Sequence, residues 1–237
     1  MAPPLRKAAA TQSPDLWLAG PLTRFGSHLL AHWRVWNSSA GGPAEAIARS
    51  LGLFAGQAAD VLAEPGRVWS RLDGPRPPAR PQRGWRPARS ASGAIALFHG
   101  WIDNQYQVAQ QLGVVSSDPG EVYLRAVERW GPRADAQLNG TYCAIVELPD
   151  GSLRLSRSPW GGPPLLYSND TGRAFVASVP RVLFAGGLDQ ELNVARFGDN
   201  LFYNMNMSDE GWYRGTWRVP QGAIVMLTPG SCRVERW

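Results

Sequence analysis

The sequence predicts an α+β fold in which antiparallel sheet is covered by helices. Segments rich in β-branched and aromatic residues stand before and after a central part with helical periodicity. Short turn signals join neighbouring strands, as at Asp150-Gly151, which can adopt the positive φ angles of a tight hairpin. Strands joined by such turns pair antiparallel, and the elements do not alternate as βαβ units do. We therefore expect an antiparallel sheet with helices on its faces.

The N-terminal half contains one predicted strand, two predicted helices and one long loop. The strand covers 29–36, and the helices cover 44–53 and 57–63, the second ending at Pro65-Gly66. Proline and arginine dominate 74–87, which excludes a helix or a central strand there. We expect this loop to be an excursion over an active site, with an interdomain linker or a proline-rich partner motif as alternatives.

A short buried strand is predicted at 94–98, followed by two helices. The first begins after Asp103 or Asn104 and stops at Gly113, and its expected apolar side consists of Tyr106, Ala109 and Leu112.

The second of these helices has the clearest start signal in the chain. Asp118 is the expected N-cap, Pro119 takes the first helical position, and Glu121 is placed to close a capping box. The apolar residues Val122, Tyr123, Ala126, Val127 and Trp130 recur at helical spacing, which predicts a buried face.

The C-terminal half is organised around residues 138–167. Strands at 141–148 and 152–156 form a hairpin, a bend rich in glycine and proline follows Arg157, and an apolar strand resumes at 165–167. Beyond it we expect a strand at 175–179, a helical turn at 180–185, a helix capped by Asn193 and a final strand at 223–227.

Composition bounds the possible partners. The chain has 237 residues, of which 44% are hydrophobic and 18% charged, and no apolar run approaches the roughly 20 residues that span a bilayer. The net charge of +5 comes from scattered arginines without a recognisable nucleic-acid module. Residues 1–20 lack the apolar run of a secretory signal. We expect a disordered tail there, a cytoplasmic protein, and neither nucleic acid nor membrane as a partner.

Cysteine and histidine do not form a metal-binding pattern. The two cysteines, Cys143 and Cys232, are too few for a disulfide framework, and Cys143 is expected to be a small core residue. His28 and His32 have i,i+4 spacing without an acidic or cysteine partner, and His99 stands apart from both. We expect no metal and no cofactor in this chain.

From Ala94 onward, four blocks resemble the N-terminal glutaminase domain of the asparagine synthetase family in order and spacing. The block Phe98-His99-Gly100-Trp101-Ile102-Asp103-Asn104 stands where that family has Asn-Gly-Glu-Ile-Tyr-Asn. The other blocks run over 118–131, 138–167 and 175–222. That family domain is a class II glutamine amidotransferase with the N-terminal-nucleophile hydrolase fold. The resemblance implies an αββα sandwich over 21–237, clearest over 94–237, with the ATP-pyrophosphatase (synthetase) domain of the family absent.

The resemblance does not extend to the family's nucleophile. Those enzymes attack glutamine with a cysteine at the mature N-terminus, whose own α-amino group acts as the base. Here Ala2 follows Met1, and no cysteine precedes Cys143. We therefore expect no catalytic residue in this chain.

The residues that bind glutamine in the family are partly replaced. The resemblance implies a vestigial glutamine pocket made by His99, Gly100, Trp101 and Asp118. Gly100 is retained, whereas His99 and Trp101 replace the asparagine and glutamate of the family motif. Asp118 stands one position out of frame with the family's aspartate, so a plain helix cap and a ligand-binding role are both open. The sequence also leaves open whether glutamine still binds.

The resemblance implies an asparagine synthetase-like protein whose parent activity is ATP-dependent amide formation with glutamine as nitrogen donor. ATP and Mg²⁺ belong to the family's synthetase domain, and residues 185–190 only echo its phosphate loop. Lasso peptide macrolactam synthetases resemble this chain in lacking the nucleophile. The alternatives are a non-catalytic scaffold or docking module for a separate synthetase or precursor peptide, and an autonomous N-terminal-nucleophile hydrolase, against which the missing cysteine argues. Whether the chain is an enzyme stays open.

Overall fold

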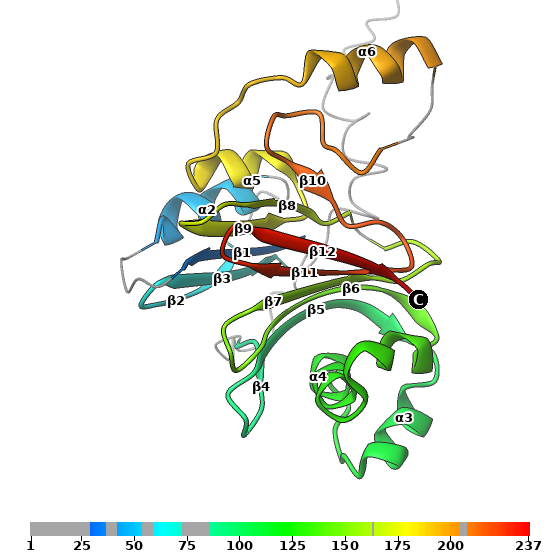
Figure 1. The fold of residues 1–237 in the computed structure, drawn as a ribbon. Coiled ribbons are helices and arrows are strands. Elements are labelled where there is room, and N and C mark those ends of the chain that lie inside the picture. The colour runs from blue at the N-terminus through cyan, green and yellow to red at the C-terminus, as the bar shows by residue number, and fades with distance from the viewer. Residues whose placement is uncertain (1–28, 37–41, 54–58, 73–85, 163, 204–207) are drawn as a thin grey trace, which may run out of the picture.

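Two six-stranded antiparallel sheets stack face to face, with helices on both outer sides (Figure 1). The computed structural model describes residues 29–36, 42–53, 59–72, 86–162, 164–203 and 208–237. Helices α2 (Ala44–Gly52) and α5 (Pro180–Ala185) lie over one sheet, and α3 (Gln105–Leu112) and α4 (Pro119–Trp130) lie under the other. The predicted αββα arrangement is therefore confirmed.

The first sheet has the strand order β10-β8-β9-β1-β3-β2. Its strands are β1 (Leu29–Val35), β2 (Asp60–Glu64), β3 (Arg67–Leu72), β8 (Leu166–Asn169), β9 (Arg173–Ala177) and β10 (Trp217–Arg218).

The predicted helix at 57–63 is wrong over its described part, since residues 60–63 belong to β2. Pro65-Gly66 is the turn of a β2–β3 hairpin, and Gly66 has the positive φ of 72° that such a turn requires. The burial of β2 alternates along its length, as expected for an edge strand with one covered face.

The second sheet has the strand order β12-β11-β7-β6-β5-β4. Its strands are β4 (Ala88–Arg89), β5 (Ile95–Ile102), β6 (Gly140–Glu147), β7 (Leu153–Arg157), β11 (Ala223–Thr228) and β12 (Ser231–Arg236). The predicted β6–β7 hairpin is confirmed, with Gly151 at a φ of 84° in its turn. The strand predicted at 94–98 continues to Ile102, so the whole His99-Gly100-Trp101 block is strand. The last strand, β12, was not predicted because its residues are mostly exposed and lack an apolar pattern.

Helix α4 begins as expected at Asp118, whose Oδ1 accepts a hydrogen bond from the amide of Gly120 at 2.8 Å. The expected capping box is replaced by a different contact, since the amide of Asp118 donates to Ser116 Oγ at 3.1 Å. The predicted apolar face of α4 is buried at Val122, Tyr123, Ala126 and Val127.

Helix α3 ends at Gly113 in the left-handed conformation, as predicted. Of its predicted apolar side, Ala109 is buried and Leu112 is partly buried against the same cluster, but Tyr106 was predicted wrongly. Val108 and Ala109 are buried, whereas Tyr106 is 76% exposed. The helix spans only two turns, so the direction of its buried face depends on how it packs against α4 and not on its own periodicity.

Three hydrophobic clusters form the interior. The central one lies between the sheets and combines Leu30, Trp69 and Val176 of the first sheet with Leu97 and Ile145 of the second. A second cluster fills the space between the second sheet and helices α3 and α4, and a third lies under α2 and α5. Alternate residues of β5 and β6 therefore face the other sheet or the helices.

Helix α6 (Val194–Tyr203) stands away from both sheets at one end of the molecule (Figure 1). The expected tail at 1–20 and residues 74–85 of the proline- and arginine-rich loop lie outside the described residues. Among the described residues, no helix has the length and apolarity that a membrane crossing requires.

Candidate functional site

Three of the predicted pocket residues stand side by side at the end of β5. His99, Gly100 and Trp101 pair with Cys143, Tyr142 and Thr141 of β6, respectively. Strand alternation places His99 with Leu97 on the side that faces the first sheet. Trp101 is 58% exposed.

Gly100 is required by the packing of β5 against β6. Its φ is 120°, and a Cβ atom added there would lie 2.1 Å from the carbonyl oxygen of Thr141. A similar close approach occurs at Gly140, where a Cβ would lie 2.2 Å from the carbonyl oxygen of Trp101. The retained glycine is thus explained by strand pairing without any role in binding an oxyanion.

The fourth predicted pocket residue, Asp118, faces a different space. Besides capping α4, it lines a cavity of about 20 Å³ together with Phe98 of β5 and Arg71 of β3. Among the described lining residues, His99, Gly100 and Trp101 are absent. The structure therefore separates the predicted set into the strand block and Asp118.

Two arginines in this small cavity were missed by the sequence analysis. Arg71 comes from the first sheet, and Arg86 lies at the end of the proline- and arginine-rich loop. Together with Asp118, these arginines place cationic and anionic groups around one cavity. An α-amino acid zwitterion requires both, a cation for its carboxylate and an anion for its ammonium group. The present volume, however, is enough for about one water molecule.

Cys143 is a core residue, as expected. It is fully buried in β6, and burial raises the pKa of its thiol to about 12, with the nearby Arg157 acting in the opposite direction. A thiol with this pKa is almost wholly protonated at neutral pH, so it is a poor nucleophile. The other cysteine, Cys232, lies exposed in β12, with its Sγ 3.3 Å from the hydroxyl of Tyr167.

The bend after β7 is fixed by Ser158. Its Oγ accepts from the amide of Tyr142 at 3.0 Å and donates to the carbonyl of Gly161 at 3.0 Å. Arg157 also reaches this bend and donates to the carbonyl of Gly162 at 3.2 Å. These contacts are structural and tie the bend to β6.

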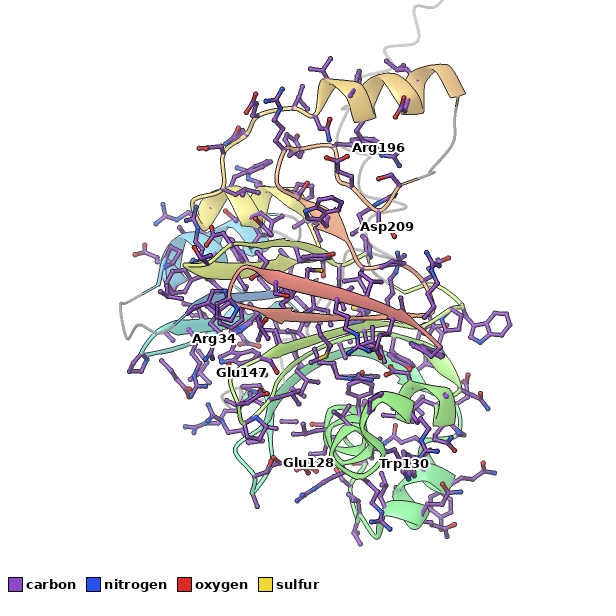
Figure 2. The ribbon with its side chains drawn as sticks, in the orientation of Figure 1. Arg34, Glu128, Trp130, Glu147, Arg196 and Asp209 are labelled. Atoms are coloured by element: carbon purple, nitrogen blue, oxygen red, sulfur yellow. The ribbon has the colours of Figure 1, made fainter. Side chains whose placement is uncertain are left out.

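A buried ion-pair network joins the two sheets at Glu147 (Figure 2). This side chain from β6 accepts from Arg34 and, at 2.7 Å, from Arg67, both of the first sheet. His32 Nε2 lies 3.8 Å from the same carboxylate, and burial lowers the pKa of His32 to about 3. His32 is therefore neutral at physiological pH, as a structural residue would be.

A second buried network lies under α4, around Asp135. Its carboxylate pairs with Arg154 and accepts hydrogen bonds from Tyr123 at 3.1 Å and Tyr142 at 2.9 Å. Ser156 donates to the same carboxylate. Burial raises the pKa of both tyrosines, which keeps their hydroxyls protonated as donors.

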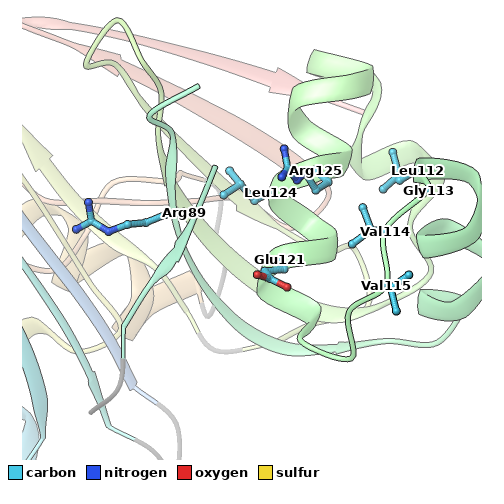
Figure 3. Close-up of a pocket in the computed structure, with 8 residues that line it drawn as sticks. All are labelled: Arg89, Leu112, Gly113, Val114, Val115, Glu121, Leu124 and Arg125. Carbon is cyan, nitrogen blue, oxygen red and sulfur yellow. The ribbon is translucent and has the colours of Figure 1, made fainter. Parts of the chain in front are cut away.

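A larger cavity, of about 370 Å³, opens beside α4 (Figure 3). Leu112, Val114 and Leu124 line it together with charged residues. Among the latter, Arg89 pairs with Glu64 and Arg125 with Glu128, so these cations already have acidic partners. The described part of the chain also contains no group of three or more potential metal ligands.

Comparison with known proteins agrees with the fold. No curated protein matches the chain significantly. Among solved structures, glutamine phosphoribosylpyrophosphate amidotransferase from B. subtilis, complexed with ADP and GMP, has 14% identity and a TM-score of 0.50 over 94% of this chain. A structure described as the allosteric regulatory enzyme of purine biosynthesis has 13% identity and a TM-score of 0.53, again over 94% of this chain. The chain spans 46% of the length of each.

These similarities show the fold, and they confirm the expected N-terminal-nucleophile hydrolase architecture. The family follows from the sequence itself. Residues 81–237, more than half of the chain, match the model of a glutamine amidotransferase domain. The match includes the β5 block, the cap of α4 and the β6–β7 hairpin. The chain therefore belongs to the glutamine amidotransferase domain family.

Proposed function

We propose that this chain is a glutamine amidotransferase-type domain that does not hydrolyse glutamine and serves as the scaffold part of an asparagine synthetase-like, amide-forming system. The observation that carries the proposal is the state of Cys143. It is the one cysteine within the family's sequence blocks, and it is fully buried with a pKa of about 12. It lies inside a strand, so it has no free α-amino group to act as its base.

The surroundings of the expected pocket support the same proposal. His99 and Trp101 occupy the positions of two polar motif residues, and Gly100 is explained by strand packing. The space beside Asp118 accommodates about one water molecule and not an amino acid. A preorganised set of oxyanion donors and a substrate-sized cavity are what hydrolysis of this kind requires.

The asparagine synthetase-like part of the proposal rests on the four sequence blocks. In this proposal a partner chain binds ATP and Mg²⁺ and forms the amide. The partner is either a separate synthetase or an enzyme that cyclises a precursor peptide, as lasso peptide macrolactam synthetases do.

The proposal is tested by measuring ammonia release from glutamine with the purified full chain, together with the intact mass of its mature N-terminus. We expect no release above the buffer rate. A catalytically competent glutamine amidotransferase, assayed in parallel, shows that the conditions support turnover.

Turnover by the wild-type chain would contradict the proposal. In that case Cys143→Ala and the matched Cys232→Ala identify the thiol responsible, since only a catalytic cysteine abolishes release when replaced. Circular dichroism of both variants verifies that they are folded.

A further inference from the structure

Strand β12 is an edge strand with one open side. It ends the second sheet, where β11 lies on one side of it and no described strand lies on the other. All residues of β12 except Glu235 are exposed, on both faces of the strand. Figure 1 shows β12 in the foreground, with no described helix or strand drawn across it. Its outer side is therefore a row of backbone donors and acceptors that can pair with a further strand.

The pairing with β11 determines which residues of β12 point to the open side. The amide of Trp237, the residue after β12, donates to the carbonyl of Gly222, the residue before β11, at 3.1 Å. Hydrogen-bonded and non-hydrogen-bonded pairs alternate along an antiparallel ladder, so every second residue counted back from Trp237 bonds to β11. The residues between them point their amide and carbonyl groups outward. These are Cys232, Val234 and Arg236.

The order of residues along β12 is complementary to a second copy of itself. Two β12 strands that pair antiparallel about a two-fold axis at Val234 bring the outward backbone groups of both chains into register. Val234 then faces Val234 of the second copy, and Cys232 faces Arg236. Between these pairs, Arg233 lies directly opposite Glu235 of the second copy. Facing residues of opposite charge stabilise an antiparallel strand pair.

The two charges of each chain also support this register. Arg233 Nη2 lies 2.7 Å from Glu235 Oε1 within the chain, and both side chains stand on the same face of β12. In the pair, each charge therefore has neighbours of opposite sign along its own strand and across to the other. An axis at Arg233 would place two arginines opposite each other, and an axis at Glu235 would place two glutamates opposite each other. Charge thus favours the axis at Val234.

The other described sheet edges lack this property. Pairing of two β2 strands about Leu62, their central residue, would place Asp60 opposite Glu64, so that acid meets acid. The remaining edge strands, β4 and β10, have two residues each, and short strands are a common protection against edge pairing. Among the described edges, β12 therefore combines length with a self-complementary order of charges.

We propose that β12 is a dimerisation edge, at which two copies of this chain pair antiparallel about an axis at Val234 and join their second sheets into one continuous sheet. The backbone groups supply the contact, and Arg233 with Glu235 sets the register. The inference goes beyond the proposed function, because the pairing does not depend on whether glutamine is hydrolysed.

The first test is sedimentation velocity of the full chain over a series of micromolar concentrations. We expect the wild type to form a dimer whose share rises with concentration. Val234→Pro removes an amide that points outward and not one that bonds to β11, so the variant should fold and should weaken dimerisation by at least about tenfold. The matched control is Val61→Pro on the edge strand β2, where Val61 is 43% exposed against 46% for Val234. It should dimerise like the wild type.

Charge exchange tests the register. Glu235→Arg places arginine opposite arginine, and Arg233→Glu places glutamate opposite glutamate, so each single variant should weaken the dimer. The double variant Arg233→Glu/Glu235→Arg restores the alternation with the signs reversed and should recover dimerisation. A residue that serves only the fold of the single chain would not show this rescue.

A disulfide reports the axis directly. In an antiparallel pair the facing residues of a hydrogen-bonded position have Cα atoms about 5.5 Å apart, a distance that a disulfide spans. Val234→Cys in a Cys232→Ser background should therefore cross-link two chains on mild oxidation. Val61→Cys in the same background is the control and should stay uncross-linked.

Three outcomes would overturn the inference: a wild type that stays monomeric throughout, a dimer that Val234→Pro leaves unchanged, or a double charge variant that dimerises no better than the single ones. Circular dichroism verifies that each variant is folded. None of these measurements involves glutamine or ammonia, so failure of the inference is distinguishable from failure of the proposed function.

Discussion

Replacing Asp135 with alanine should strongly destabilise the protein. Asp135 and its partner Arg154 are 0% and 3% exposed, and the carboxylate also accepts hydrogen bonds from three hydroxyl groups. Among the described residues, alanine would leave the buried guanidinium of Arg154 with the hydroxyl of Tyr123 as its remaining hydrogen-bond partner. Neither Arg154 nor the tyrosines can reach solvent without opening the contact between α4 and the second sheet.

The magnitude follows from the cost of an uncompensated buried charge. Removing one partner of a buried ion pair costs about 3–5 kcal/mol, and each orphaned buried hydroxyl adds about 1 kcal/mol or more. These contributions overlap within one network, so we expect a loss of about 4–6 kcal/mol in the free energy of unfolding. For a domain whose total stability is of the order of 5–15 kcal/mol, this is enough to leave a marginal protein.

Urea unfolding followed by tryptophan fluorescence measures the effect. Asp189→Ala, at an exposed aspartate, is the matched control and should stay within about 0.5 kcal/mol of the wild type. The double variant Asp135→Leu/Arg154→Met should recover part of the loss, because an apolar pair of similar volume does not leave a charge unpaired. A single variant that unfolds within about 1 kcal/mol of the wild type would refute the reasoning.

Two further effects are expected in stability measurements. Gly100→Ala should lower the free energy of unfolding by several kcal/mol, because its Cβ would lie 2.1 Å from the carbonyl oxygen of Thr141. The control is Gly93→Ala, at a φ of 93° but in open space, which should lower it by only about 1 kcal/mol. Equal losses in melting temperature for the two variants would contradict the packing argument. The pKa of His32 is lowered from 6.5 to about 3 in the folded state, so the unfolded state binds the proton first as pH falls. Stability contributed by neutral His32 is therefore full above about pH 6.5 and is lost progressively toward pH 3. From pH 7 to pH 5, the free energy of unfolding of the wild type should fall by about 2 kcal/mol more than that of His32→Gln, as measured by urea unfolding at each pH. The same pH dependence in both proteins would show that His32 titrates normally.

Local signals in the sequence were sufficient for the elements that depend on local physics. The turn at Asp150-Gly151, the cap at Asp118 and the stop at Gly113 were each predicted from residue types that favour one backbone conformation. The helix predicted at 57–63 failed because its apolar residues fit a short helix and an edge strand equally well. Pairing with β3, which lies outside that window, decides between them.

The candidate site was less predictable because it depends on contacts between distant segments. Arg71 and Asp118 are far apart in sequence and meet only when the two sheets stack. The network around Asp135 likewise draws on α4, β6 and β7. Single residues of these types occur throughout the chain, so no local pattern distinguishes them before the fold is known.

Gly100, the retained motif residue of the expected pocket, shows that a matching motif residue need not indicate function. Its positive φ, and the carbonyl oxygen of Thr141 that would lie 2.1 Å from an added Cβ, exclude a side chain on steric grounds alone. Selection for β5–β6 strand pairing alone would therefore retain this glycine, while the neighbouring positions, now His99 and Trp101, would be free to change. The same holds for the hairpin turn and the α4 cap, which serve backbone geometry. Under the proposed function, a scaffold that does not hydrolyse glutamine is expected to keep these parts of the pattern, because the fold itself requires them.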